Sequence, residues 1–270
     1  MVVQHNLSAM NTNRQMGVVT SALQKSTEKL SSGYKINRAG DDAAGLSISE
    51  KMRSQIRGLN KASDNAQDGI SLIQVAEGAL NETHSILQRM NELATQAAND
   101  TNTSVDRQSI KDEIEQLNEE LDRISTTTQF NKQDLLTGGF SGKLQVGALE
   151  GQTMDVKISL AVSAKGLRVS AVEVSTNVKA GDAMQSIQDA IESVSKQRSK
   201  LGAIQNRLEH TINNLDTNAE NTQAAESRIR DTDMADEMVQ YSKNNILSQA
   251  GQSMLTQANQ QTQGVLSLLQ

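Results

Sequence analysis

A heptad pattern near the C-terminal end is the feature that most constrains how this chain can fold. Its positions follow one another at alternating steps of three and four residues, and most of them are apolar: Met184, Ile187, Ile191, Val194, Arg198, Leu201, Gln205, Leu208, Ile212, Leu215, Ala219 and Thr222. Such a seam is typical of long helices that pack side by side as a coiled coil. We predict one long helix here, with Asp182, directly after Gly181, as its N-cap.

A second long helix is predicted from about Asp42 to about Ala98. Its main seam contains Met52, Ile56, Leu59, Ala66, Ile70, Ile73, Leu80, Leu87 and Ala94, and a neighbouring stripe contains Leu72, Ala76, Ala79, Ile86, Met90, Leu93 and Ala97. Two adjacent stripes indicate that the helix packs against more than one partner. At 1.5 Å per residue it would be about 85 Å long. This length predicts an elongated coiled-coil or helical-bundle rod rather than a compact domain.

A third helix is expected to begin near Thr103, where Thr103 and Asp106 have the spacing of a capping box. The segment from Asn99 to Thr103 would form the turn that folds this helix back against the second one.

From Phe130 to about Lys179 the apolar period changes from that of helices to that of strands. Apolar and polar residues alternate around Leu144, Val146, Met154, Val156, Ile158, Leu160 and Val162. Glu150-Gly151 between them predicts a hairpin turn, and Val169 to Val174 is a candidate for a further strand. We therefore expect a small β patch at about residues 130–180.

The two ends carry weaker seams, interrupted by Gly, Ser and Gln. Helices this weak are marginal in water when isolated. We expect residues 1–41 and 234–270 to pair as an inner terminal coiled coil that is disordered in the monomer, and residues 42–233 to form a helical rod domain. The predicted polymerisation seam contains Leu23, Leu30, Leu247, Met254, Val265 and Leu268. The fold class is thus mainly α, with a small β-hairpin patch and paired terminal segments.

The composition argues against several classes of function. The net charge is −6 and the basic residues are dispersed, so we expect no nucleic-acid partner. No apolar run approaches the roughly 20 residues of a membrane span, so no membrane partner is expected. The first residues lack the pattern of a cleaved signal peptide. Aromatic residues are few, and Trp, Pro and Cys are absent, so burial must come from aliphatic side chains packed along helices.

Candidate chemical sites are sparse. His5, His84 and His210 are isolated and do not have the spacing of metal ligands. The pair Asp41-Asp42 lies at the start of a predicted long helix, where capping explains it better than metal binding. No nucleotide-binding or hydrolase motif occurs. We therefore expect no catalytic residue, no metal and no cofactor, and we do not expect an enzyme.

Several long segments resemble bacterial flagellins. In the N-terminal half these are LSSGYKINRAGDDAAGLSISEKMRSQIRGL (residues 30–59) and NAQDGISLIQVAEGAL (residues 65–80). In the C-terminal half they are LGAIQNRLEHTINNL (residues 201–215), AAESRIRDTDMADEM (residues 224–238) and VLSLLQ (residues 265–270). The resemblance covers about residues 1–160 and 180–270. It implies a short form that lacks the variable outer domains, with Gln270 and Gln260-Gln261-Thr262 as small departures.

The resemblance implies a structural subunit that is exported and polymerises into the bacterial flagellar filament for motility. It implies a secreted, extracellular protein whose partners are other copies of itself, an export chaperone and the export apparatus, and the filament cap and junction proteins. It further implies that the free subunit is a ligand of the innate immune receptor Toll-like receptor 5, through Arg89, Leu93 and Glu113. In that interpretation Leu93 is an exposed anchor; its place in an apolar stripe leaves a core position open.

Two other functions remain open at this stage. A hook–filament junction protein would share weak terminal heptads. A cytoplasmic coiled-coil scaffold would share the long seams but would not need the β patch.

Overall fold

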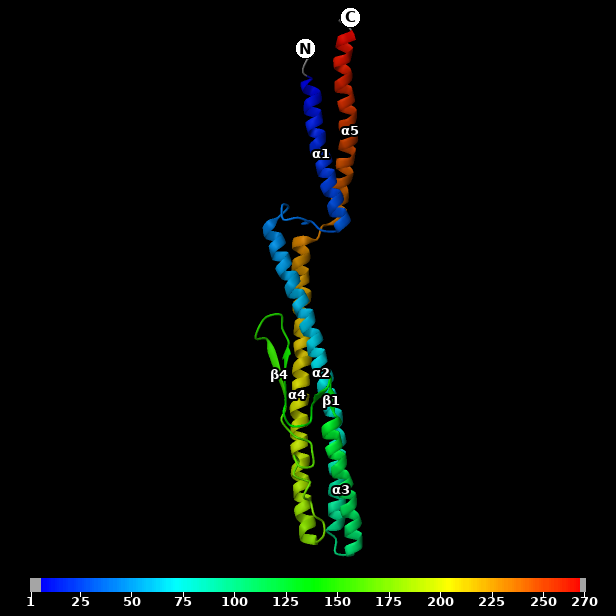
Figure 1. Cartoon of the computed structure of the whole chain (residues 1–270). Coiled ribbons are helices and arrows are strands. Elements are labelled where there is room, and N and C mark those ends of the chain that lie inside the picture. Colours follow the sequence, from blue (N-terminus) through cyan, green and yellow to red (C-terminus); the bar gives the residue numbers. More distant parts are fainter. Residues whose placement is uncertain (1–5, 268–270) are drawn as a thin grey trace. The chain divides into compact units, whose positions relative to one another are not determined.

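The computed structural model describes the backbone of residues 6–267 and the side chains of residues 6–261 (Figure 1). The chain divides into two compact units. We call residues 1–54 with 221–270 the terminal unit, and residues 55–220 the central unit. Two long helices, α2 (Ala43–Ala97) and α4 (Asn177–Arg230), contribute residues to both units.

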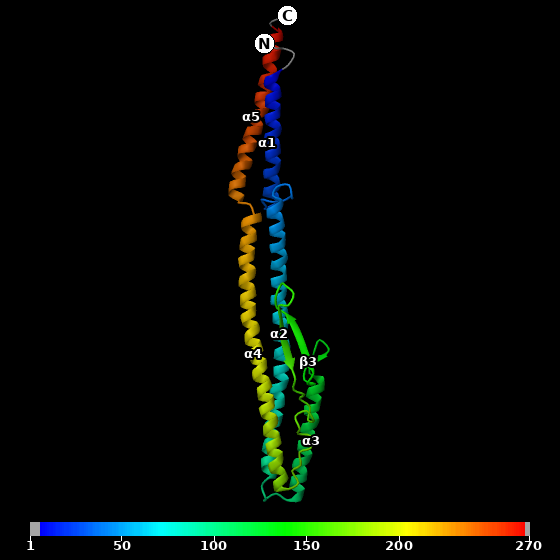
Figure 2. The same cartoon turned by 90° about the vertical axis from the view of Figure 1, so that its left-hand side faces the viewer.

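The terminal unit is built around a pair of antiparallel helices, α1 (Leu7–Ser32) and α5 (Met234–Ser267). They lie side by side in Figures 1 and 2. At one end the Asn6 side chain donates a hydrogen bond to the Ala258 carbonyl over 3.0 Å. At the other end Lys29 pairs with Glu237 at 3.4 Å. The predicted pairing of the N- and C-terminal segments is therefore present.

A short connection leads from α1 to α2 within the terminal unit. The helix α1 ends at Gly33, whose φ of 75° is readily adopted only by glycine and whose N–H donates to the Lys29 carbonyl. Ile36 in the connection is buried. Asp42 then caps α2 by accepting a hydrogen bond from the Gly45 N–H at 2.9 Å. Asp42 thus serves as a cap, as its position in the sequence predicts.

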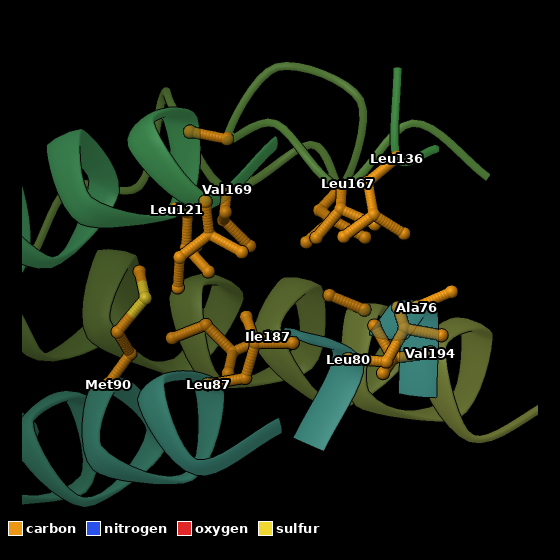
Figure 3. Packing of buried hydrophobic residues seen from close by; sticks show 14 of the residues in the cluster. Ala76, Leu80, Leu87, Met90, Leu121, Leu136, Leu167, Val169, Ile187 and Val194 are labelled. Atoms are coloured by element: carbon orange, nitrogen blue, oxygen red, sulfur yellow. The ribbon is translucent and has the colours of Figure 1, made fainter. Parts of the chain in front are cut away.

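The central unit packs three helices around one aliphatic core. The third helix, α3 (Ser104–Thr127), lies beside α2 and α4 in Figures 1 and 2. Figure 3 shows Leu87 and Met90 of α2 near Ile187 of α4, with Leu121 of α3 above them. Fully buried side chains from the three helices include Ile73, Leu80, Leu87, Met90, Ile114, Leu121, Ile187, Leu201 and Leu208. Every position of the predicted seam in α4 is buried or half-buried, so the coiled-coil prediction for this segment is confirmed.

The N-terminus of α3 has the predicted capping box. The Thr103 hydroxyl accepts from the Asp106 N–H at 3.3 Å, and the Asp106 carboxylate accepts from the Thr103 N–H at 2.9 Å. Two backbone N–H groups that the helix leaves unpaired are satisfied in this way.

The β patch consists of two small antiparallel hairpins. The first pairs β1 (Gln129–Phe130) with β2 (Gln133–Asp134), and the second pairs β3 (Phe140–Gln145) with β4 (Thr153–Ile158). In the second hairpin Phe140 lies opposite Ile158 and Gln145 opposite Thr153. Alternate residues of β4 are buried, namely Met154, Val156 and Ile158. This register confirms the period-two prediction.

Two glycines of α2 let the larger hairpin approach the helix. A β-carbon at Gly58 would lie 2.8 Å from that of Ala148, and one at Gly69 would lie 2.3 Å from Leu144 Cδ1. Between them Asn65 donates to the Gln145 carbonyl at 3.1 Å. The hairpin is therefore docked on α2 by close backbone approach and by one side-chain hydrogen bond.

Two predictions about local structure are wrong. The helix α4 begins at Asn177 rather than after Asp182, because Thr176 accepts from the Lys179 N–H and Ala180 already faces the core. Residues 169–174 form a short turn and irregular backbone rather than a strand, although Val169 and Val174 are buried.

The units divide inside α2 and α4, between residues 54 and 55 and between residues 220 and 221. The sequence predicts these boundaries between residues 41 and 42 and between residues 233 and 234, in each case 13 residues nearer the terminus. The mainly α fold class with a small hairpin patch is confirmed. None of the described helices has the length and hydrophobicity needed to span a membrane.

Candidate assembly interface

The face that α1 turns toward α5 is lined by small and medium-sized side chains. Leu23 and Leu30, both in the predicted polymerisation seam, are half-buried there, and Ser26 between them is buried. Further along, Met16 lies against Gly251, where a β-carbon would be 3.9 Å from Met16 Cγ. The two helices therefore meet over a seam with few large apolar contacts.

The face that α5 turns toward α1 is offset from the predicted seam. Its inward residues include Ser248, Gly251, Leu255 and Ala258, at steps of three and four. Leu247 and Met254 do not face α1 and are 44% and 61% exposed. The small residues let α5 approach α1 closely. Neighbouring residues of a helix point about 100° apart, so Leu247 and Met254 point away from the face that contains Ser248 and Leu255. The exposure of Leu247 and Met254 therefore contradicts a position on the face toward α1. Their role in polymerisation stays a prediction.

Several large apolar side chains of α5 lie outside the face that the helix turns toward α1. Val239 and Ile246 are seven residues apart, as are Leu247 and Met254, and this spacing places each pair on one side of the helix. All four side chains are exposed. We call Val239, Ile246, Leu247 and Met254 the outer stripe. The neighbouring helix α1 adds exposed Leu7, Met10 and Val18.

This exposure distinguishes the terminal unit. Among its apolar side chains that the structure describes, only Ile36 and Ala258 are buried. Burying a Val, Leu, Ile or Met side chain contributes about 1.5–3 kcal/mol. Large exposed apolar patches mark interaction surfaces in soluble proteins. The outer stripe is therefore the candidate interface.

Two further residues of the predicted polymerisation seam lie at the end of the chain. Val265 belongs to α5, but its side chain is outside the part that the structure describes. Leu268 lies outside the described residues altogether. Both assignments stay predictions.

The predicted receptor-binding residues separate into a surface pair and a core residue. Arg89 of α2 donates from Nε to the Glu113 carboxylate of α3 at 3.0 Å and from Nη1 to Glu92 at 3.2 Å. The hydrogen bond with Glu113, followed by that with Glu92, raises the pKa of Arg89 above its ordinary value. Leu93 is only 2% exposed and belongs to the core. The expectation that Leu93 is an exposed anchor is wrong, because its stripe faces the interior. Receptor binding itself stays a prediction.

One residue with structural importance was not found from the sequence. Arg230, at the end of α4, lies over the Tyr34 ring at 4.9 Å and pairs with Glu50 of α2. The adjoining backbone is joined as well, since the Lys35 N–H donates to the Arg230 carbonyl at 2.6 Å. The partners are almost 200 residues apart in sequence, so no local pattern reveals the cluster.

Nothing in the described residues suggests a metal centre. No three His, Asp or Glu side chains gather there as potential ligands. His84 is half-buried on α2, and its Nε2 lies 3.1 Å from the side-chain amide nitrogen of Gln88.

Comparison with known proteins gives consistent matches at both ends of the chain. The bacterial flagellin N-terminal helical region matches residues 3–141, and the bacterial flagellin C-terminal helical region matches residues 184–269. These ranges contain α1 to α3, most of α4 and the whole of α5.

Curated relatives match along their whole length. The chain is 56% identical over 271 residues to the flagellin of Halalkalibacterium halodurans and 51% identical over 286 residues to the flagellar filament 31.3 kDa core protein of Treponema maltophilum. Each alignment covers 100% of both chains.

Solved structures agree in fold. Bacillus cereus flagellin is 33% identical with a TM-score of 0.51, over 60% of this chain and 94% of that one. A putative flagellar hook-associated protein from Vibrio parahaemolyticus has a TM-score of 0.60 at 13% identity, over 71% of this chain and 100% of that one. On the evidence of the two terminal regions and the end-to-end relatives, this chain belongs to the bacterial flagellin family and is a short member of it.

Proposed function

We propose that the chain is a structural subunit that polymerises into the bacterial flagellar filament. The observation that carries the proposal is the outer stripe, which leaves four large apolar side chains of α5 in solvent. The protein named as a filament core protein in Treponema maltophilum, 51% identical over the full length, supports the same function. Contact with further copies of the chain would bury the stripe.

The proposed mechanism separates folding from assembly. The central unit buries its own core and supplies a preformed body. The terminal helices hold each other through small residues, and their pairing leaves apolar area available for neighbouring subunits. Each side chain of the outer stripe that becomes buried would contribute about 1.5–3 kcal/mol. Because the contact repeats at every subunit, a modest local gain would stabilise a long polymer.

The proposal includes export before assembly, since a flagellar filament lies outside the cell. An export chaperone and the export apparatus would handle the chain before polymerisation, and the filament cap and junction proteins would contact it afterwards. The weak inward seam of α5 supports this part, because a helix with few large contacts is easily held by another partner.

Filament elongation tests the central proposal. Wild-type subunit added to short filament seeds should form long uniform tubes that pellet and are visible by negative-stain microscopy. The double variant Leu247→Gln/Met254→Gln should keep its helical content but elongate poorly. Val178→Gln, which changes an exposed apolar residue of the central unit, is the control and should elongate normally.

Two outcomes would contradict the assignment. Normal elongation of the double variant would show that the outer stripe is not buried by assembly. Equal loss in the control variant would show that the stripe has no special part. Short rods from the wild-type chain would favour a coiled-coil scaffold instead.

A second proposal concerns the free subunit as a ligand of Toll-like receptor 5. Its support is the exposed pair of Arg89 and Glu113, which brings α2 and α3 into one surface. Leu93 lies one helical turn from Arg89, and its side chain is buried. It would therefore hold this surface in position and would not contact the receptor. Arg89→Ala should weaken binding to the receptor ectodomain without a large change in melting temperature. Undiminished binding of that variant would contradict the proposal.

The hook-associated alternative rests on fold alone. The Vibrio parahaemolyticus protein resembles the chain in structure at only 13% identity. The end-to-end match at 56% to a flagellin favours the filament role.

A further inference from the structure

The methionines of this chain are distributed unevenly between the two units. Nine of the ten are in the described residues. In the terminal unit four are exposed: Met10, Met234, Met238 and Met254. In the central unit Met90 and Met154 are buried, and Met184 is half-buried against the core. All exposed methionines of the described chain therefore lie on α1 and α5.

The composition makes these thioethers the principal targets of mild oxidants. The chain contains no cysteine and no tryptophan. Methionine reacts with a peroxide by attack of sulfur on one peroxide oxygen. The O–O bond breaks, an S–O bond forms, sulfur loses two electrons, and the peroxide is reduced to water. The product, methionine sulfoxide, is polar where the thioether was apolar.

The positions of these methionines suggest how their oxidation would affect assembly. Met254 is part of the outer stripe and is 61% exposed, while Met10 adjoins Leu7 on the neighbouring helix and is 66% exposed. Met234 and Met238 are four residues apart at the start of α5, on one side of the helix. A sulfoxide at such a position would have to be desolvated on assembly, without a hydrogen-bond partner provided for it.

We propose that Met10, Met234, Met238 and Met254 form an oxidation-sensitive control point for self-assembly. Peroxide converts them to sulfoxides in the free subunit and stops its incorporation, whereas burial in the polymer protects them. Reduction of the sulfoxides restores assembly competence. The inference rests on the proposed polymerisation, and it adds a reversible modification at Met254 of the outer stripe and at three other exposed methionines of α1 and α5.

The test begins with the free subunit and hydrogen peroxide. Peptide mass spectrometry should show the four exposed methionines oxidised before Met90 and Met154. Peroxide treatment in denaturant, where every methionine is accessible, provides the reference rates. This readout does not depend on polymerisation. Oxidation of Met90 as fast as Met254 in the native subunit would overturn the proposal.

Seeded elongation provides the second readout. Oxidised wild-type subunit should need a concentration about tenfold or more higher to elongate, and tenfold corresponds to a total loss of about 1.4 kcal/mol per subunit. The variant with all four exposed methionines changed to leucine keeps apolar volume and is compared with itself: its elongation after peroxide treatment should equal its own elongation without peroxide. Met90→Leu is the matched control and should remain as sensitive as wild type. Treatment with methionine sulfoxide reductases A and B and dithiothreitol should restore the oxidised wild type.

The outcomes separate this inference from the proposed function. If untreated wild-type subunit does not elongate on seeds, the polymerisation proposal fails. If untreated subunit elongates and the oxidised subunit elongates equally well, only the oxidation proposal fails. Persistent inhibition of the four-leucine variant by peroxide would overturn the assignment to these methionines.

Discussion

The central and terminal units use the same kinds of residue and bury them to very different extents. In the central unit three helices and a hairpin enclose leucine, isoleucine and valine side chains from several elements. In the terminal unit two helices meet mainly over serine, glycine, alanine and half-buried leucine, and several of their larger apolar residues remain in solvent. Two helices alone cannot enclose a core, because each has only one neighbour.

The difference has a functional meaning for a flagellin. A unit with a complete core is stable before assembly and keeps its shape. A unit with an incomplete core gains stability only when other copies supply the missing neighbours. The pair α1 and α5 is therefore suited to couple ordering to polymerisation.

The largest expected effect comes from matched leucine truncations in the two units. Leu93→Ala removes a side chain that is buried in the central core and should cost about 2–5 kcal/mol of folding stability. Leu247→Ala in the outer stripe should leave the melting temperature nearly unchanged and reduce elongation instead. Thermal unfolding followed by circular dichroism measures the first effect and seeded elongation the second. Equal melting temperatures of the two variants would remove the distinction between the units.

A smaller effect is expected where the chain passes from the first hairpin to the second. Gly138 has a φ of 91°, and a β-carbon there would lie 2.9 Å from the Ala161 nitrogen. Gly138→Ala should therefore cost about 1–3 kcal/mol through backbone strain. The adjacent Gly139 has free space around it, so Gly139→Ala is the control. Denaturant unfolding monitored for both variants should separate them, and a similar loss in each would contradict the strain argument.

The smallest effect concerns pH and the capping box of α3. Hydrogen bonds from the Thr103 hydroxyl and then from its N–H lower the pKa of Asp106 below the ordinary aspartate value. A carboxyl with a depressed folded-state pKa contributes stability above its unfolded-state pKa, and this contribution is lost as the pH falls through the folded-state value.

Asp106→Asn should accordingly melt at a lower temperature than wild type near neutral pH, with the difference shrinking in acid. Melting curves at a series of pH values measure this, with the exposed Asp68→Asn variant as control. A difference that grows as the pH falls would show that the sign is wrong.

The sequence predicts the regular parts of the fold well. The long seam of α4 and the double stripe of α2 are repeated many times, so single exceptions such as Arg198 do not obscure the period. The hairpin and the capping box of α3 were recognisable for a different reason, since turn residues, caps and alternation act locally.

The parts that escaped prediction depend on tertiary contacts. The inward face of α5 is chosen by how closely Gly251 and Ala258 let it approach α1, and periodicity alone gave Leu247 and Met254 where the structure has Ser248 and Leu255. Leu93 lies in a stripe that is buried only because α3 and α4 cover it. Arg230 meets Tyr34 and Glu50 through the fold, without any local signal.

The central claim is that the terminal helices are stabilised by assembly whereas the central unit is stable alone. Hydrogen exchange read by mass spectrometry, on the free subunit and on the filament, tests it most directly. We expect amides of residues 55–220 in the core helices to be protected in both states. Amides of α1 and α5 should exchange rapidly in the free subunit and slowly in the filament. Strong and equal protection of α1 and α5 in the free subunit would contradict the account.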